Sequence, residues 1–421
     1  MLVPQHRETD WIFSTESGHM QLLLNSPGIS RLILIGNLPP ITADQSPAIY
    51  HRPTYDGADS RAKLEASLTP LLIALSPKSS LVDGFFDIPF LSYEDNVICS
   101  VTVKRCVGTR VGEMLVEDVE IEKTGEIECS KREFRRRLRF KRMPNLVQTE
   151  IRIVPERGFG SDCLGIGEVE FRPDLGVLVH PYLAPMVASL SLIGCYLDER
   201  IRSGFSPKAL CVGVGGGALL GFLRTQLGFE VIGVEVDEGV LRVARQYFGL
   251  EDDELIRVCV GDGIELIEKF ARQFDERNSP SSGVHEVENE MDSDNVDGFD
   301  TKFDVIMVDL DSSDVRNGII APPLEFARKP VLLNARLALC SLGILVVNVI
   351  PPSSSFYETL LLEFREVFHE LYEIDVGNGE NFVLIASASP IGTTSGRREN
   401  SFLKNLKLVI SGEYVDSIRK I

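Results

Sequence analysis

One stretch, Ala209–Gly249, constrains the fold of this chain more than any other. An apolar run at Ala209–Val212 predicts a buried strand, and glycines follow it at once at positions 213, 215, 216 and 217. Apolar residues then recur at helical spacing in Ala218–Leu227, and a second apolar run, Val231–Val234, ends in Glu235. The order of strand, glycine-rich turn, helix, strand and acid predicts a Rossmann-like unit that binds a nucleoside.

The spacing of the glycines distinguishes between two cofactor classes. Gly213, Gly215 and Gly217 alternate, whereas the dinucleotide pattern is G-x-G-x-x-G. Glycines let the backbone approach a ligand closely, the following helix N-terminus offers free N–H groups, and Glu235 can accept hydrogen bonds from ribose hydroxyls, with Val236 beside the adenine. We therefore predict S-adenosylmethionine rather than NAD. An ordinary turn without a ligand is the plainer alternative.

Composition narrows the class of partner. The chain has 421 residues, a length that suits two domains, and a net charge of −19, which argues against a nucleic-acid or anionic-membrane binder. Its eight cysteines form no C-x-x-C pair, so we expect reduced thiols in a cytoplasmic protein and no metal site. The first residues have no apolar core typical of a leader, and no stretch reaches transmembrane length.

Residues 1–158 predict a smaller β-rich domain. Strands are expected at Arg31–Gly36, from Ile98, from Gly112 and from Val147, with a helix over Ala62–Ser76. The only dense basic run, 131–142, is either a docking surface for an acidic partner or, as we prefer, a strand with one solvated arginine face.

Residues 159–391 predict the Rossmann-like domain, with an α/β, mostly parallel sheet. His180 and Tyr182 precede an apolar helix expected at Ala184–Leu197, where they could face a ligand or simply pack beside Pro181. Asp262 and Gly263 follow the third strand. The Asp262 carboxylate could accept a hydrogen bond from the adenine amino group, cap the next helix, or do both.

Two further segments complete this domain. Residues 273–300 are polar and acidic, so we expect a disordered insertion away from the cofactor. The apolar strand from Phe303 ends in Asp309 and Asp311, followed by Asp314, and ligand chemistry in open parallel sheets lies at this carboxyl edge. These acids predict a pocket for an amine. Strands or helices follow to Ser387, and 392–421 is read as a C-terminal extension.

These motifs resemble those of the class I methyltransferase fold. The runs VGVGGGALL at 212–220, GDG at 261–263 and DVIMVDLDSSD at 304–314 are similar to those of spermidine synthase and other aminopropyltransferases. The similarity to the C-terminal half of the methyltransferase-like protein 13 family is closer, through QYFGL at 246–250, DGIELI at 262–267, APPLEF at 321–326 and the closing YVDSIRKI. It covers the chain from about Arg135 onward, and the earlier part more loosely.

The resemblance implies an activity and a partner. That family is described as methylating a lysine and the N-terminal amine of translation elongation factor 1-alpha, and its C-terminal half is assigned to the N-terminal amine. It therefore implies methyl transfer to that amine, with Asp309 and Asp311 holding the amine and accepting its proton. Aminopropyltransferases usually carry an amine-anchoring Asp where this chain has Ala218. Two alternative functions stay open: aminopropyl transfer to a polyamine, and a non-catalytic scaffold. A homodimer is compatible with each of them.

Overall fold

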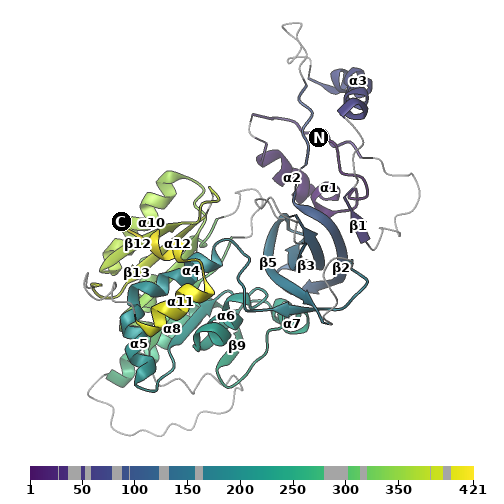
Figure 1. Cartoon of the computed structure of the whole chain (residues 1–421). Coiled ribbons are helices and arrows are strands. Elements are labelled where there is room, and N and C mark those ends of the chain that lie inside the picture. Colours follow the sequence, from purple (N-terminus) through teal and green to yellow (C-terminus); the bar gives the residue numbers. More distant parts are fainter. Residues whose placement is uncertain are drawn as a thin grey trace.

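The protein contains two β-sheets (Figure 1). The computed structural model describes all residues except 27, 37–48, 53–57, 78–87, 94, 123–131, 157–164, 279–301, 313–319, 380 and 392–399. The first sheet is antiparallel with six strands, and the second is mixed with eight. Asp314 and nearly all of the expected insertion therefore lie outside the described residues.

The first sheet is a meander in which each strand pairs with the next. Half-buried and buried side chains alternate along the first part of its fourth strand, whereas its third strand is buried along most of its length. Its strands are β1 (Ile49–His51), β2 (Val97–Gly108), β3 (Gly112–Ile121), β4 (Glu133–Phe140), β5 (Met143–Pro155) and β6 (Phe171–Asp174). Since β6 pairs with β5, the sheet extends past the boundary expected at residue 158. The strand expected at Arg31–Gly36 was wrong, because in this segment only Ile35 forms a single bridge, to Leu2.

The arginines of β4 form ion pairs with acids of the neighbouring strands. The basic run is therefore neither a docking surface of unpaired arginines nor a solvated arginine face. Arg136 forms an ion pair of 2.6 Å with Asp118, and Arg135 and Arg137 share Glu150. Burial works to raise the pKa of Glu150, but these two guanidinium groups hold it below its ordinary value. The run is a strand, as preferred, but its arginines neutralise neighbouring acids instead of facing solvent. Lys131 lies outside the described residues.

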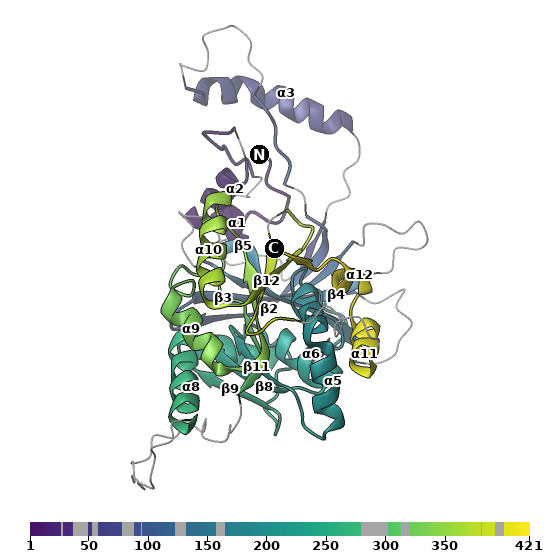
Figure 2. The same cartoon turned by 90° about the vertical axis from the view of Figure 1, so that its left-hand side faces the viewer.

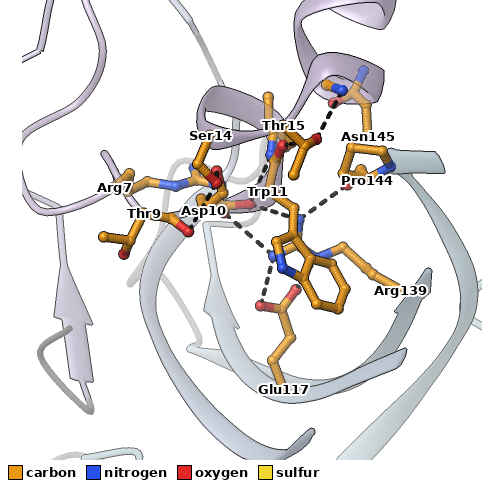
Figure 3. A network of polar contacts seen from close by, with 12 residues as sticks. Arg7, Thr9, Asp10, Trp11, Ser14, Thr15, Glu117, Arg139, Pro144 and Asn145 are labelled. Atoms are coloured by element: carbon orange, nitrogen blue, oxygen red, sulfur yellow. Dashed lines mark hydrogen bonds and ion pairs between the residues drawn. The ribbon is translucent and has the colours of Figure 1, made fainter. Parts of the chain in front are cut away.

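A buried polar network fastens the N-terminal helices to this sheet (Figure 3). Asp10 caps α1 (Trp11–Ser14) and accepts hydrogen bonds from Arg139, which also contacts Glu117. Burial alone would raise the pKa of Asp10, but Arg139 and Arg7 hold it far below its ordinary value. The network thus fixes α1 and α2 (Glu16–Leu24) over β5. Helix α3 (Ala58–Leu75) agrees with the helix expected near 62–76.

The second sheet has the strand order of the class I methyltransferase fold, β14-β12-β13-β11-β10-β7-β8-β9. Strands β7 to β11 run parallel, and β13 is antiparallel to β11. From β7 the chain adds β8 and β9 on one side of the sheet, and it then adds β10 and β11 on the other side. Such sheets bind ligands at this switch point, between β7 and β10. The strands are β7 (Lys208–Val212), β8 (Glu230–Glu235), β9 (Ile256–Val260), β10 (Phe303–Val308), β11 (Leu339–Val349), β12 (Glu370–Asp375), β13 (Phe382–Ser387) and β14 (Arg419–Lys420).

Helices cover both faces of the second sheet (Figure 2). One face carries α8 (Gly263–Asn278), α9 (Lys329–Ala338) and α10 (Ser354–Val367). The other carries α4 (Leu183–Ala188), α5 (Gly194–Arg202), α6 (Ala218–Leu227), α7 (Glu238–Tyr247), α11 (Ser401–Val409) and the short α12 (Gly412–Asp416). No helix among the described residues is long and apolar enough to cross a membrane.

Three expectations for this domain need correction. The helix expected at Ala184–Leu197 is interrupted by a 3-10 turn, Ser189–Ile193. Helix α8 continues to Asn278, past the expected start of the insertion at residue 273. The C-terminal segment is no separate extension, because α11 packs on α5 and β14 pairs with β12.

Candidate functional site

A cavity of about 360 Å³ lies at the switch point, between the carboxyl edge of the second sheet and the first sheet. Its size is in the range of pockets for small ligands. The second sheet contributes the glycine turn, Glu235, Asp309, Asp311 and Asn348, and the first sheet contributes residues of its β2–β3 and β4–β5 turns and of β5: Arg110, Val111, Arg142, Leu146, Val147, Gln148, Thr149 and Glu150. Both sheets are therefore needed to form the site.

The glycine turn is shaped by its neighbours. Gly213 has φ +90°, and a Cβ there would lie 2.1 Å from the carbonyl oxygen of Asp309, so only glycine fits between β7 and β10. The Gly216 N–H donates to Thr149 Oγ1 at 2.8 Å, which fixes the turn against β5. Gly217 begins α6 without a side-chain cap, and Ala218 and Leu219 line the cavity. The helix N-terminus therefore faces the cavity with N–H groups that no capping side chain accepts.

Glu235 lies at the end of β8 with its carboxylate in the cavity wall. It is 9% exposed and accepts N–H bonds of 3.3 Å from Val214 and Gly215. Burial raises the pKa of Glu235, and these backbone N–H groups oppose the rise. Val236 also lines the cavity and is 39% exposed, as a residue that packs on a ligand would be.

Three predicted cofactor residues do not line the cavity. Gly217 is the N-cap of α6, where a Cβ would lie 2.9 Å from Leu250. Asp262 accepts hydrogen bonds from the N–H groups of Ile264 and Glu265, so it caps α8, which was one of its two expected roles. A Cβ on Gly263 would lie 2.3 Å from Val212, which explains glycine there by packing. Contact of Asp262 with adenine stays a prediction.

A residue that the sequence did not single out, Asp237, joins the two sheets beside Glu235. Its fully buried carboxylate accepts hydrogen bonds from Thr109 (3.3 Å), Arg110 (2.6 Å) and Val111 (2.9 Å) in the β2–β3 turn, and from Gly239 (2.8 Å) in α7. Burial works to raise the pKa of Asp237, but these N–H groups hold it below its ordinary value. The β2–β3 turn is thereby held over the cofactor side of the cavity.

Asp309 is the centre of a hydrogen-bonded chain on the other side. Tyr182 Oη donates to Asp309 Oδ2 at 2.9 Å, Asn348 Nδ2 donates to Asp309 Oδ1 at 3.0 Å, and Asn381 Nδ2 donates to Asn348 Oδ1 at 2.9 Å. Burial raises the pKa of Asp309, whereas Asn348, His180 and Tyr182 oppose the rise. The carboxylate is therefore held in one orientation at the edge of the cavity, with a heightened affinity for a proton.

Several buried polar atoms around Asp309 have no hydrogen-bond partner among the described residues. They are His180 Nδ1, Asp311 Oδ2, Ser312 Oγ, Gln148 Nε2 and Arg142 Nε. Burial lowers the pKa of His180 and raises that of Asp311, and Arg142 opposes the rise at Asp311. Buried polar atoms are nearly always satisfied in folded proteins. Four of the five residues, all except Ser312, line the cavity, which indicates a polar ligand that supplies the missing partners.

The structure brings together most of the residues expected to act. Gly213, Gly215, Glu235, Val236, Asp309 and Asp311 line one cavity, together with His180 and Tyr182, whose role the sequence left open. Sequence reasoning missed Thr149, Asp237 and Asn348. Asp237 follows the acid of β8 and begins a helix, which is a signal for a cap, but nothing in the sequence indicates its partners in the β2–β3 turn.

Comparisons with known proteins agree with the resemblance found in the motifs. No protein-family profile matches the chain. The chain is 27% identical over 400 residues to the eEF1A lysine and N-terminal methyltransferase of Danio rerio, covering 92% of this chain and 50% of that protein. The Bos taurus protein of the same name is 26% identical over 388 residues, covering 88% of this chain and 48% of that protein.

A solved structure gives a weaker likeness. The crystal structure of human methyltransferase-like protein 13 in complex with SAH is 22% identical, covers 57% of this chain and 94% of that chain, and has a TM-score of 0.42. The chain spans about half the length of the relatives in Danio rerio and Bos taurus. The relatives in Danio rerio and Bos taurus confirm the resemblance seen in the sequence, while the fold is established by the strand order above.

Proposed function

We propose that the protein is an S-adenosylmethionine-dependent methyltransferase that acts on a protein amine, namely the N-terminal amine of translation elongation factor 1-alpha. One observation carries the proposal: a glycine turn with a buried acid and a pair of half-buried carboxylates, Asp309 and Asp311, line one cavity. The first set suits a nucleoside, and the second suits an amine. The substrate is inferred from the relatives, whose name includes eEF1A lysine and N-terminal methyltransferase.

The residues present fit the cofactor. Gly213 and Gly215 line the cavity and admit no side chain, because a Cβ there would meet Asp309 or Thr149, and Glu235 holds a buried carboxylate that ribose hydroxyls can satisfy. Val236 offers an apolar surface to the adenine ring. When bound, S-adenosylmethionine supplies an electrophilic methyl group on a sulfonium.

The chain's own residues would prepare the acceptor amine. An α-amine has a pKa of about 7.7–8.0 and is therefore mostly protonated at pH 7, so the site must remove a proton before nitrogen can react. Asp309, oriented by Tyr182 and Asn348, would accept that proton, since burial raises its pKa. Positioning of the amine between Asp309 and Asp311 then supplies much of the remaining rate. We place this chemistry in the cytoplasm, and the absence of a disulfide among the six described cysteines is compatible with that compartment.

Aminopropyl transfer is the competing reaction on this fold. Two arginines, Arg110 and Arg142, line the cavity, and Ala218 stands where an anchoring acid would be expected. Without that acid the far amine of a polyamine lacks its anchor, so the cavity favours methyl transfer.

Cofactor preference tests the proposed function. Isothermal titration should give tighter binding of S-adenosylmethionine than of its decarboxylated form, and incubation with putrescine should yield no spermidine. Tighter binding of the decarboxylated form, together with spermidine production, would overturn the proposed function in favour of aminopropyl transfer.

A further inference from the structure

The β4–β5 turn of the first sheet places a guanidinium at the acid side of the cavity. Arg142, in that turn, lines the cavity together with Asp311. Its neighbours in the basic run pair with acids, but Arg142 forms no ion pair with any described residue, and its Nε is buried without a hydrogen-bond partner. It rests over the ring of Phe140, 5.2 Å from the centroid, which fixes the guanidinium plane.

The carboxylate of Asp311 lies near the Arg142 guanidinium but does not form an ion pair with it. Arg142 is close enough to oppose the rise in the pKa of Asp311, yet Asp311 Oδ2 also lacks a partner among the described residues. Gln148, on β5, lies close enough to Asp311 to lower the pKa of that carboxyl, while its Nε2 has no partner in hydrogen-bond geometry among the described residues. A purely structural pair would close to contact, because an unsatisfied buried polar atom costs about 1–3 kcal/mol. Donors and an acceptor are therefore left facing the same space.

We propose that Arg142 and Gln148 recognise the first peptide carbonyl of the substrate while Asp311 accepts an N–H of its α-amine. This inference rests on the proposed function and deepens it, because it names the substrate class as the end of a peptide chain. A peptide N-terminus carries an amine and, two atoms further on, a carbonyl oxygen, so it supplies a donor to Asp311 and an acceptor to Arg142. A polyamine or a lysine side chain has no such carbonyl.

The proposal gives the first sheet a function. Hydrogen bonds to Asp237 hold its β2–β3 turn over the cofactor side of the cavity. Its β4–β5 turn carries Arg142, which is proposed to recognise the substrate. Arg142 does not touch the reacting nitrogen, so it is a specificity residue, whereas Asp309 is the proposed proton acceptor.

A cycle of variants and peptides tests this. Wild type and Arg142→Gln would be assayed with a peptide that matches the N-terminus of elongation factor 1-alpha, and with an isostere whose first peptide bond is a trans alkene. Wild type should lose tenfold or more in kcat/KM on the isostere, in keeping with loss of a hydrogen bond to a charged group. Arg142→Gln should be equally slow on both peptides. Arg142→Lys should lie between, because it keeps the charge without the guanidinium fork.

Matched measurements separate the possible failures. Arg365→Gln, at an exposed arginine of α10 outside the cavity, should behave as wild type. Titration with S-adenosylmethionine should give the same affinity for wild type and Arg142→Gln, which verifies folding. If Arg142→Gln still distinguishes the peptide from its isostere as wild type does, the recognition role is wrong and the proposed function stands. If wild type binds the cofactor and methylates neither peptide, the proposed substrate fails and this inference fails with it.

Discussion

Replacement of Asp237 by Asn should weaken the contact between the two sheets of this protein. The carboxylate is fully buried, and each of its oxygens accepts two N–H bonds: Oδ1 from Thr109 and Gly239, and Oδ2 from Arg110 and Val111. An Asn side chain keeps one accepting oxygen and turns an NH₂ group toward the other two donors. The variant therefore loses two hydrogen bonds to a charged acceptor and gains a donor facing donors.

The magnitude follows from these contacts. Each hydrogen bond to a charged group contributes about 1.5–3 kcal/mol, and the longer Thr109 contact argues for the lower end, so the free energy of unfolding should fall by about 3 kcal/mol. With a urea m-value of about 3 kcal/mol/M, the midpoint should shift by about 1 M.

The single tryptophan makes the effect observable. Trp11 is buried in the unit of the first sheet, so its fluorescence reports on that unit while circular dichroism reports on the whole chain. Asp253→Asn is the control, since Asp253 also accepts two N–H bonds but is exposed. We expect the Trp11 transition of Asp237→Asn to precede the dichroism transition. Coincident transitions with a shift no larger than that of Asp253→Asn would refute the reasoning.

The pKa of Asp237 adds a pH dependence of definite sign. Its folded-state pKa lies below the unfolded value of about 3.9, so its stabilisation is complete above that pH and is lost as pH falls further. The gap between wild type and Asp237→Asn should be constant near neutral pH and should shrink below about pH 4.

Three variants probe the cavity itself. Glu235→Gln should weaken S-adenosylmethionine binding by roughly 10–100-fold in isothermal titration, because the ribose hydroxyls lose a charged acceptor, and unchanged affinity would remove Glu235 from the cofactor site. Asp309→Asn should bind the cofactor within about threefold of wild type but lose on the order of 100-fold or more in methyl transfer, since Asn cannot accept the proton, and near-normal turnover would assign proton removal elsewhere. Gly213→Ala should fail to bind cofactor or to fold, because its Cβ would meet the carbonyl oxygen of Asp309, and a Tm equal to that of wild type would contradict the stated close approach.

The sequence could predict the parts of the site that are local. The glycine turn, Glu235 and the acids after β10 follow short apolar runs, and parallel strands bring their carboxyl ends to one edge. Residues such as Asp309 and Glu235 could therefore be placed together without coordinates. Their grouping around one cavity agrees with that expectation.

The remainder depends on contacts between distant segments. Asp237 meets the β2–β3 turn 126 to 128 residues earlier in the chain, and no local pattern predicts that pairing. The helix expected at Ala184–Leu197 is interrupted where Ser189 bonds back to the Met186 carbonyl and where Gly194 admits Leu403 of α11. Strand β14 is too short to carry a periodic signal, and its pairing with β12 arises from the fold.

The position of the transferred methyl group tests the central claim most directly. Elongation factor 1-alpha with a free N-terminus, and the same protein with an acetylated N-terminus, would be incubated with the enzyme and isotopically labelled S-adenosylmethionine, then digested and mapped by mass spectrometry. Our account predicts label in the N-terminal peptide of the free form and none in the acetylated form. Label on a lysine in both forms, or no label from an enzyme that binds the cofactor, would contradict it.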